Sequence, residues 1–300
     1  MSVANVLFDV LAPVALVVVL GAVVGRRLDF DVASLSRLSF YVLGPAFVFA
    51  VLADAELDGS VVVRLVLAGL AGMAASLVVV AVWARIGDVD FEIAAATAMT
   101  SAYGNVGNAG LAIVGFALGD DALPIAGVLM LTINIGGLVL SVGLAEARSR
   151  SPFHAVVRAV SAPMAVAGAL AVVVNAGNVD LPLVIDRPIG LLAGALIPIM
   201  LFTLGLQLVQ TGATRPTGDV GLMLACKLAL APLAAGAVAA ALGLDGDFLD
   251  AVIIQSAMPP AVFCAVVAIE YDLAPDRVTT GVVVGTIASV LTLPVVLIAL

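Results

Sequence analysis

The sequence predicts an all-α polytopic membrane protein: ten transmembrane helices in a 5+5 inverted repeat, with two broken, crossing helices, the fourth and the ninth. Three observations lead to this prediction. The composition is too apolar for a water-facing surface, the apolar residues fall into ten stretches of roughly membrane-spanning length, and the two halves repeat a pattern of prolines.

Composition excludes the soluble classes of protein. The chain is 63% hydrophobic and 11% charged over 300 residues, with a mean hydropathy of +1.27, whereas a soluble domain is about 45–50% apolar and about 25% charged. At roughly 30 residues for a span and its connection, the length holds about ten helices and no separate soluble domain. A cytosolic enzyme and a nucleic-acid-binding module are both excluded.

Polar residues punctuate the apolar stretches and give the expected limits of each helix. The ten predicted spans are 4–25, 34–53, 60–84, 92–117, 122–145, 160–178, 188–210, 219–243, 248–269 and 277–300. The first span has no basic segment before it and no small-residue cleavage pattern after it, so it is interpreted as a helix and not as a removable signal peptide.

Basic residues orient the chain, because arginine and lysine in short loops stay on the cytoplasmic side. Nine arginines fall in odd-numbered loops and two in even-numbered loops, while Lys227 lies inside a span. We therefore expect a multi-pass protein of the cell membrane with both termini extracellular. The odd-loop arginines are Arg26, Arg27, Arg37, Arg85, Arg148, Arg150, Arg158, Arg215 and Arg277.

The longest polar connection divides the chain into a first five-helix repeat (1–148), a cytoplasmic connection (149–159) and a second repeat (160–300). Pro45 and Pro198 are 153 residues apart, and so are Val106 and Pro259. Because each half holds an odd number of spans, the second enters the membrane inverted. Inverted repeats are typical of secondary transporters, whose substrates bind at the midplane where the repeats meet.

The centre of the fourth span is a poor helix former. It contains Gly104, Asn105, Gly107, Asn108 and Gly110, and each glycine costs about 1 kcal/mol relative to alanine in a helix. Unwound backbone at this depth is tolerated only where protein or a water-filled cavity surrounds it. The alternative is that the glycines only permit close helix packing.

The ninth span is interrupted at the matching depth by Gln255, Met258, Pro259 and Pro260. The paired prolines remove two backbone donors and clash with the preceding turn, although they could also make a kink that binds nothing. Two breaks at matching positions favour a binding site over two unrelated kinks. The predicted substrate-binding residues are Asn105, Gly107, Asn108, Gln255, Met258, Pro259 and Pro260.

These motifs resemble those of the auxin efflux carrier family of membrane transporters. The stretch 105–111 is similar to the family's Asn-x-Gly-x-x-Gly-Leu-Pro motif, except that Ala112 stands where the family has proline. Further similarity covers segments 38–45, 227–232, 257–261, 270–275 and 289–294. The resemblance implies a ten-helix carrier with two crossing broken helices and elevator-type alternating access. It also implies a small organic anion as substrate, an auxin-like carboxylate or a dicarboxylate, commonly exported.

Two polar residues inside spans are predicted to support or couple the site. Lys227 lies near the middle of its span, where a cation is costly and usually faces a cavity or a partner. It could neutralise a substrate carboxylate, act as a fixed cation where relatives hold sodium, or snorkel to an interface. Asn134 could line a cavity or hydrogen-bond between helices.

Several alternatives stay open from the sequence. Sodium-coupled uptake of the bile-acid-symporter type is disfavoured, because no acidic residue lies between Glu92 and Asp120. A non-transporting membrane receptor would not need two matched breaks. An intramembrane enzyme would need a nucleophile with a base, or paired aspartates at depth, and neither is present. Since no phosphate-binding loop occurs, any energy coupling should come from a gradient of the substrate or of an ion, either proton or sodium.

No cofactor and no metal site is predicted. Cys226 and Cys264 both lie inside apolar stretches, which suggests neither a disulfide nor a zinc site. The expected partners are the small organic anion and the lipid bilayer, and a homodimer and a monomer are both compatible with the sequence.

Overall fold

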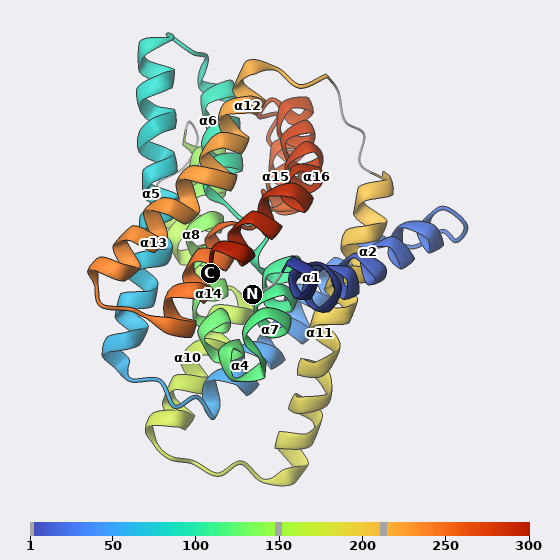
Figure 1. The fold of residues 1–300 in the computed structure, drawn as a ribbon, viewed down its shortest axis with the longest axis vertical. Coiled ribbons are helices and arrows are strands. Elements are labelled where there is room, and N and C mark those ends of the chain that lie inside the picture. The colour runs from blue at the N-terminus through green and yellow to red at the C-terminus, as the bar shows by residue number, and fades with distance from the viewer. Residues whose placement is uncertain (1–2, 148–151, 211–214) are drawn as a thin grey trace.

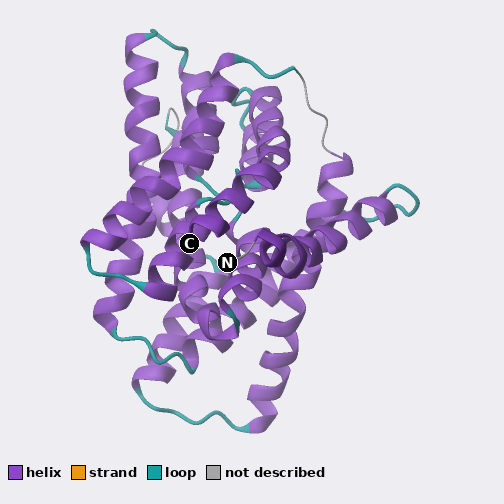
Figure 2. Cartoon of the chain, viewed as in Figure 1, coloured by secondary structure: helices purple, strands orange, loops and turns teal. Residues whose placement is uncertain are grey.

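The computed structural model describes residues 3–147, 152–210 and 215–300, and nearly all of these are helical. Figure 2 shows helices joined by short loops, with no strand in the described part of the chain apart from one isolated bridge. The helices are α1 (Val3–Asn5), α2 (Ala12–Gly25), α3 (Val32–Leu38), α4 (Gly44–Ala53), α5 (Gly59–Ile86), α6 (Phe91–Ala102), α7 (Leu111–Leu118), α8 (Leu123–Glu146), α9 (Pro152–Val160), α10 (Pro163–Ala176), α11 (Leu183–Gln210), α12 (Gly218–Ala225), α13 (Ala231–Ala241), α14 (Gly246–Ser256), α15 (Val262–Glu270) and α16 (Pro275–Ala299).

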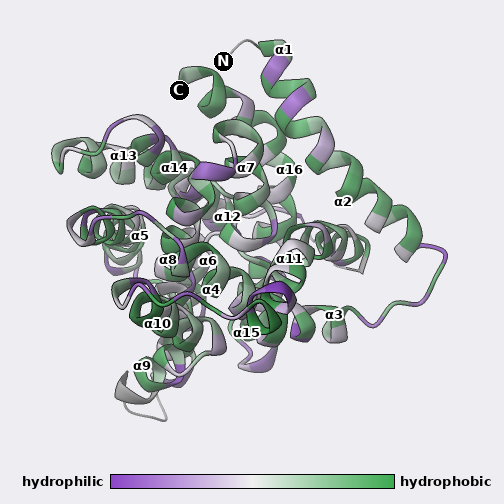
Figure 3. Cartoon of the chain, turned by 90° about the horizontal axis from the view of Figure 1, so that it is seen from below, coloured by the Kyte–Doolittle hydropathy of each residue, from purple (hydrophilic) through white to green (hydrophobic). Residues whose placement is uncertain are grey.

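Seven helical stretches within the described residues are long and apolar enough to cross a membrane. They are Val3–Gly25, Val32–Ala53, Gly59–Ile86, Asp120–Glu146, Leu183–Val209, Gly218–Ala241 and Pro275–Ala299. Figure 3 shows hydrophobic residues along the helices and hydrophilic ones mostly in the loops between them. The all-helical membrane class predicted from composition is therefore confirmed.

Helix limits differ from the predicted spans mainly at two places. The span predicted to begin at Pro188 begins at Leu183, so Pro188 lies inside α11 and does not mark its start. The predicted polar connection contains a short helix, α9, in which Ala155 and Ala159 are buried. Arg148 and Arg150 lie outside the described residues.

Four wide π-helical turns interrupt the helices: η1 (Val6–Leu11), η2 (Ser39–Leu43), η3 (Val106–Gly110) and η5 (Cys226–Leu230). Three of them are followed, at the second residue, by Pro13, Pro45 or Pro232. A proline ring clashes with the carbonyl four residues earlier, and widening the helix by one residue relieves that clash. At η3 the same position holds Ala112, so the turn forms there without a proline.

The helices pack as two groups, and in Figure 1 α11 lies on the right of the molecule and α5 on the left. In the α11 group, α11 packs on α2 and α4, and α10 packs on α4. In the crossover group, α5 packs on α6, α8 and α13, and α14 to α16 complete the unit.

Within each group, glycines let helix backbones touch. A β-carbon at Gly21 would collide with the carbonyl oxygen of Phe202, and one at Gly205 would collide with that of Val18. In the crossover group, a β-carbon at Gly72 would lie 2.8 Å from the Ala231 carbonyl oxygen. Such close approaches are how small residues hold membrane helices together.

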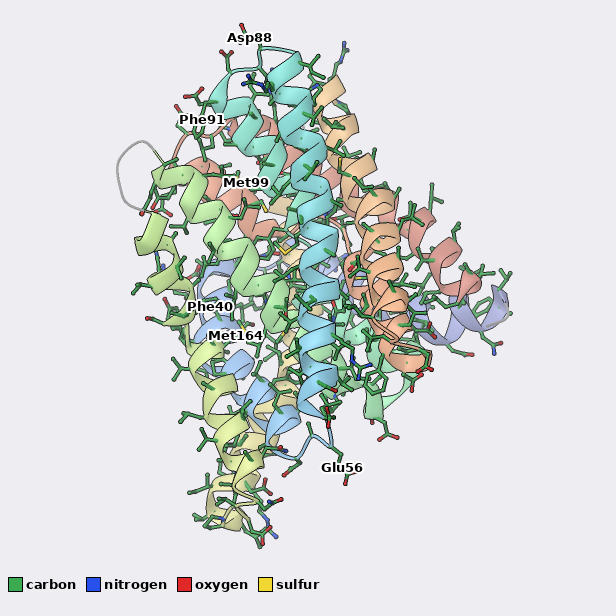
Figure 4. The ribbon with its side chains drawn as sticks, turned by 90° about the vertical axis from the view of Figure 1, so that its left-hand side faces the viewer. Phe40, Glu56, Asp88, Phe91, Met99 and Met164 are labelled. Atoms are coloured by element: carbon green, nitrogen blue, oxygen red, sulfur yellow. The ribbon has the colours of Figure 1, made fainter. Side chains whose placement is uncertain are left out.

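Loops at the two ends of α5 lie far apart, as the labelled Glu56 and Asp88 show in Figure 4. At the Glu56 end, Asp58 caps α5 by accepting a 2.7 Å hydrogen bond from the Ser60 backbone N–H. Hydrogen bonding from Ser60 also holds the pKa of Asp58 below its usual value. The cap fixes where α5 begins.

Candidate functional site

Two helix breaks meet in the crossover group. α6 ends at Ala102, α14 ends at Ser256, and the extended segments that follow pair antiparallel, with Gly104 opposite Pro260. The Asn105 N–H donates to the Pro259 carbonyl over 2.7 Å, and the Ala261 N–H donates to the Tyr103 carbonyl over 2.9 Å. Each break thus supplies hydrogen-bond partners that hydrocarbon could not.

The first break lies slightly earlier than the sequence predicts. We expected unwinding at Asn105–Asn108, whereas the extended segment is Tyr103–Asn105 and the helix resumes at Val106 in the π-helical turn η3. Gly107 and Asn108 therefore belong to a turn that regains helical hydrogen bonds, since the Leu111 N–H donates to the Val106 carbonyl. The second break spans 257–261, around the predicted Met258–Pro260.

Lys227 reaches the crossing from the π-helical turn η5. Its Nζ donates a 2.6 Å hydrogen bond to the carbonyl oxygen of Ser256, the last residue of α14. A β-carbon added at Gly104 would lie 2.8 Å from Lys227 Cε, so the side chain also lies against the first break. The lysine is 2% exposed, and its position within the group leaves no path for snorkelling.

This location places the lysine at the negative ends of two half-helices. The carboxyl end of a helix carries about half a negative charge, and the amino end about half a positive charge. α6 and α14 both end beside Lys227, so its amino group, when protonated, neutralises these two carboxyl ends. The other half of each broken helix follows the crossing segment along the chain, so the amino-terminal ends of η3 and α15 come directly after the crossing.

Three buried polar atoms without a hydrogen-bond partner in the described structure lie on the two broken helices, and further ones lie on other helices, Ser39 Oγ and Thr203 Oγ1 among them. The three on the broken helices are Ser101 Oγ, Asn105 Nδ2 and Gln255 Oε1. Leaving such a group unpaired costs about 1–3 kcal/mol of folding free energy. A buried polar atom without a partner in a native protein therefore needs an explanation, such as a bound molecule or water. Asn105 Nδ2 is a donor, which suits an anionic ligand.

The remaining predicted site residues differ in their surroundings. Gln255 is fully buried, where its Nε2 lies 3.5 Å from the Ala126 carbonyl oxygen and its Oε1 packs against Gly110. Met258, Pro259 and Pro260 are buried in the crossing, and Asn108 is half-buried.

Gly107 faces out of the crossover group. A β-carbon there would lie 2.9 Å from Cε of Met200 on α11, so η3 presents its first turn to the α11 group. Leu131 on α8 likewise packs against Gly168 on α10, which is a second contact between the two groups.

Asn134 does not point into a cavity; its Oδ1 accepts a 3.0 Å hydrogen bond from the Tyr103 hydroxyl. Tyr103 was not among the predicted residues. The signal that could have found it is an aromatic residue directly before the glycine and asparagine of the first break.

Two cavities flank the α5–α8 contact. A cavity of about 10 Å³, close to the volume one water needs, is lined by Lys227, Ser256, Met73, Ile133 and several glycines and alanines. A groove of about 670 Å³ lies between α5 and α8 on one side and α4 and α10 on the other. Its walls are almost wholly apolar, and the amide of Asn175 at its rim already donates to the Ala53 and Ala55 carbonyls.

Comparison with known proteins agrees with this architecture. Residues 145–297 match a family model described as "Membrane transport protein". The chain is 28% identical to an uncharacterized transporter of Methanothermobacter thermautotrophicus over 284 residues, which cover 91% of this chain and 90% of that protein. It is 32% identical over 127 residues to probable auxin efflux carrier component 5b of Oryza sativa subsp. japonica, covering 40% of this chain and 33% of that protein.

A second plant relative is auxin efflux carrier component 2 of Arabidopsis thaliana, with 28% identity over 114 residues, 37% of this chain and 18% of that protein. The similarity to both plant proteins therefore spans a third of their length or less. The family match covers just over half of the chain, and the family is the one that the motifs resemble. The chain belongs to the auxin efflux carrier family of membrane transport proteins.

Proposed function

We propose that this chain is a secondary active exporter of small organic anions that works by elevator-type alternating access. The observation that carries the proposal is the antiparallel crossing of two broken helices, with Lys227 bound at the carboxyl ends of the first half-helices. Because the lysine occupies those negative ends, the amino-terminal ends of η3 and α15 are left to attract an anion.

The residues around η3 support a carboxylate as the bound group. Asn105 Nδ2 is a buried donor with no partner in the described structure, and it lies at the amino-terminal end of η3. Lys227 already donates one of its three N–H groups to the Ser256 carbonyl and lies at the carboxyl ends of α6 and α14, so the chain itself engages much of its charge. This favours an auxin-like monocarboxylate over a dicarboxylate.

Helix packing supports ten helices in a 5+5 inverted repeat. If the halves are equivalent, the contact of the first helix with the seventh should have a counterpart between the sixth and the second. Both contacts occur, as α2 with α11 and α10 with α4. The contacts of α5 with α6 and of α13 with α14 form a second such pair.

The interface between the groups supports sliding. Gly21, Gly72 and Gly205 bring backbones into contact within the groups. Between the groups, three glycines face apolar side chains instead: Gly107 faces Met200, Gly127 faces Val51, and Gly168 faces Leu131. Apolar side-chain ends repack at little cost, so one group could move against the other without breaking backbone contacts.

The test is flux into proteoliposomes that contain the purified chain. We expect saturable, gradient-driven transport of indole-3-acetate, weaker transport of succinate, and no stimulation by sodium when pH and sodium are varied separately. Sodium stimulation would support the bile-acid-symporter alternative, and the absence of flux for every carboxylate tested would overturn the proposal.

A further inference from the structure

Tyr103 is the first residue of the extended segment that crosses the second break. Its backbone is held at both ends, because its N–H donates to the Met99 carbonyl at the end of α6 and its carbonyl accepts from the Ala261 N–H. The segment that continues from it contains Gly104 and Asn105, whose backbone pairs with the other break.

The Tyr103 side chain turns away from the crossing and lies on α8. A β-carbon at Gly137 would collide with the ring, so the ring rests directly on the helix backbone. One turn earlier on α8, Asn134 Oδ1 accepts the 3.0 Å hydrogen bond from the hydroxyl. The ring also meets Phe263 of α15 edge to face, with the two ring centroids 6.1 Å apart. This separation lies within the range of about 4.5–7 Å that aromatic pairs prefer.

One side chain therefore touches three elements: the first break, α8 and the second half of the other broken helix. We propose that Tyr103 is a positioning residue that fixes the crossing segment to α8 and so sets where Asn105 presents its amide to substrate. Asn134 is its hydrogen-bond partner. Gly137 leaves room for the ring, because the β-carbon of any larger residue there would collide with it. The effect on substrate rests on the proposed function, whereas the effect on the crossing does not.

The chain offers a matched control for this role. The Tyr271 hydroxyl also hydrogen-bonds to α8, through Glu146 Oε1 at 3.3 Å. It lies after α15 and away from the crossing hydrogen bonds, so Tyr271→Phe removes a bond of the same kind without loosening the crossing.

The first measurement needs no substrate. Hydrogen–deuterium exchange of the full chain in nanodiscs would follow the Asn105 and Ala261 amides, which make the two crossing hydrogen bonds. Tyr103→Phe should speed their exchange about tenfold, the factor that one such hydrogen bond is worth, and Tyr271→Phe should leave it unchanged. Equal exchange in the two variants would overturn the proposal.

The second measurement separates positioning from stability. Asn134→Leu alone leaves the tyrosine hydroxyl unpaired, whereas Tyr103→Phe combined with Asn134→Leu removes both partners and should recover thermal stability. If Tyr103 positions the site, the double variant still shows fast exchange and a raised KM for indole-3-acetate with little change in Vmax.

Recovery of exchange and KM together with stability would mean that the contact is only structural, and the proposal would fail. Loss of all flux in the wild-type chain would instead count against the proposed function, and the exchange measurement would still decide whether Tyr103 fixes the crossing.

Discussion

The Lys227 amino group is bound to the carbonyl oxygen of Ser256, the residue at which α14 ends. Through this contact, the positive charge of the lysine stabilises the carboxyl end of the protein's own broken helix. A carbonyl at the end of a half-helix is one of the oxygens that a sodium ion at the crossing would need. The lysine thus supplies from within the chain a positive charge that a bound cation could otherwise supply.

Replacing Lys227 should impair cycling more than binding. Lys227→Met leaves the Ser256 carbonyl without its donor and removes the charge from two negative helix ends, with an expected loss of about 1.5–3 kcal/mol in stability. We expect a lower Vmax for indole-3-acetate with a near-normal KM, and a smaller loss for Lys227→Gln, which keeps a donor. A large rise in KM with Vmax unchanged would mean that the lysine contacts substrate instead.

Filling Gly107 should stop transport without unfolding the chain. A leucine there would project into the interface between the two groups, because a β-carbon at position 107 would already lie 2.9 Å from Cε of Met200 on α11. The larger side chain should prevent the two groups from moving past each other. Flux in proteoliposomes should be abolished while size-exclusion behaviour and membrane insertion stay normal. Gly194→Leu is the control, because no atom lies within 4 Å of a β-carbon at that position of α11. Normal flux in the Gly107 variant would argue against this interface moving.

Much of the architecture is predictable because it depends on local chemistry. Spans follow from apolar length, and breaks follow from residues that cannot hold a helix, as at Gly104 and Pro259. Their meeting is not local: the hydrogen bond from Asn105 to Pro259 joins residues 154 positions apart in sequence, and only the fold brings them together.

Two details that the sequence did not predict have separate physical causes. The shift of the first break to Tyr103–Asn105 depends on η3, since a π-helical turn can satisfy the backbone of residues that ordinary helix propensities would leave unwound. The role of Asn134 depends on Tyr103, which reaches it across 31 positions in the sequence. Pairing between side chains of separate helices leaves no periodic signal.

Orientation can be checked by cysteine labelling in intact cells. Cysteines at Arg26 and Arg85 should be protected from an impermeant maleimide, because both belong to odd-numbered loops, whereas one at Glu56 should react. Glu56 is preferable to Asp58, whose carboxylate caps α5. The native Cys226 and Cys264 are buried and supply a silent background. The opposite labelling pattern would invert the topology and the assignment of the two half-sites.

Restoring the family's proline at position 112 should be tolerated. Ala112 is the second residue after η3, the place that Pro13, Pro45 and Pro232 take after the other three π-helical turns. Since the turn has already widened, the ring of a proline at 112 should meet no clashing carbonyl, and its fixed backbone angle should raise stability by about 0.4–1 kcal/mol. Ala117→Pro, later in α7, should instead cost about 3 kcal/mol. Thermal unfolding in detergent measures both, and equal destabilisation by the two prolines would show that η3 is not equivalent to the proline-linked turns.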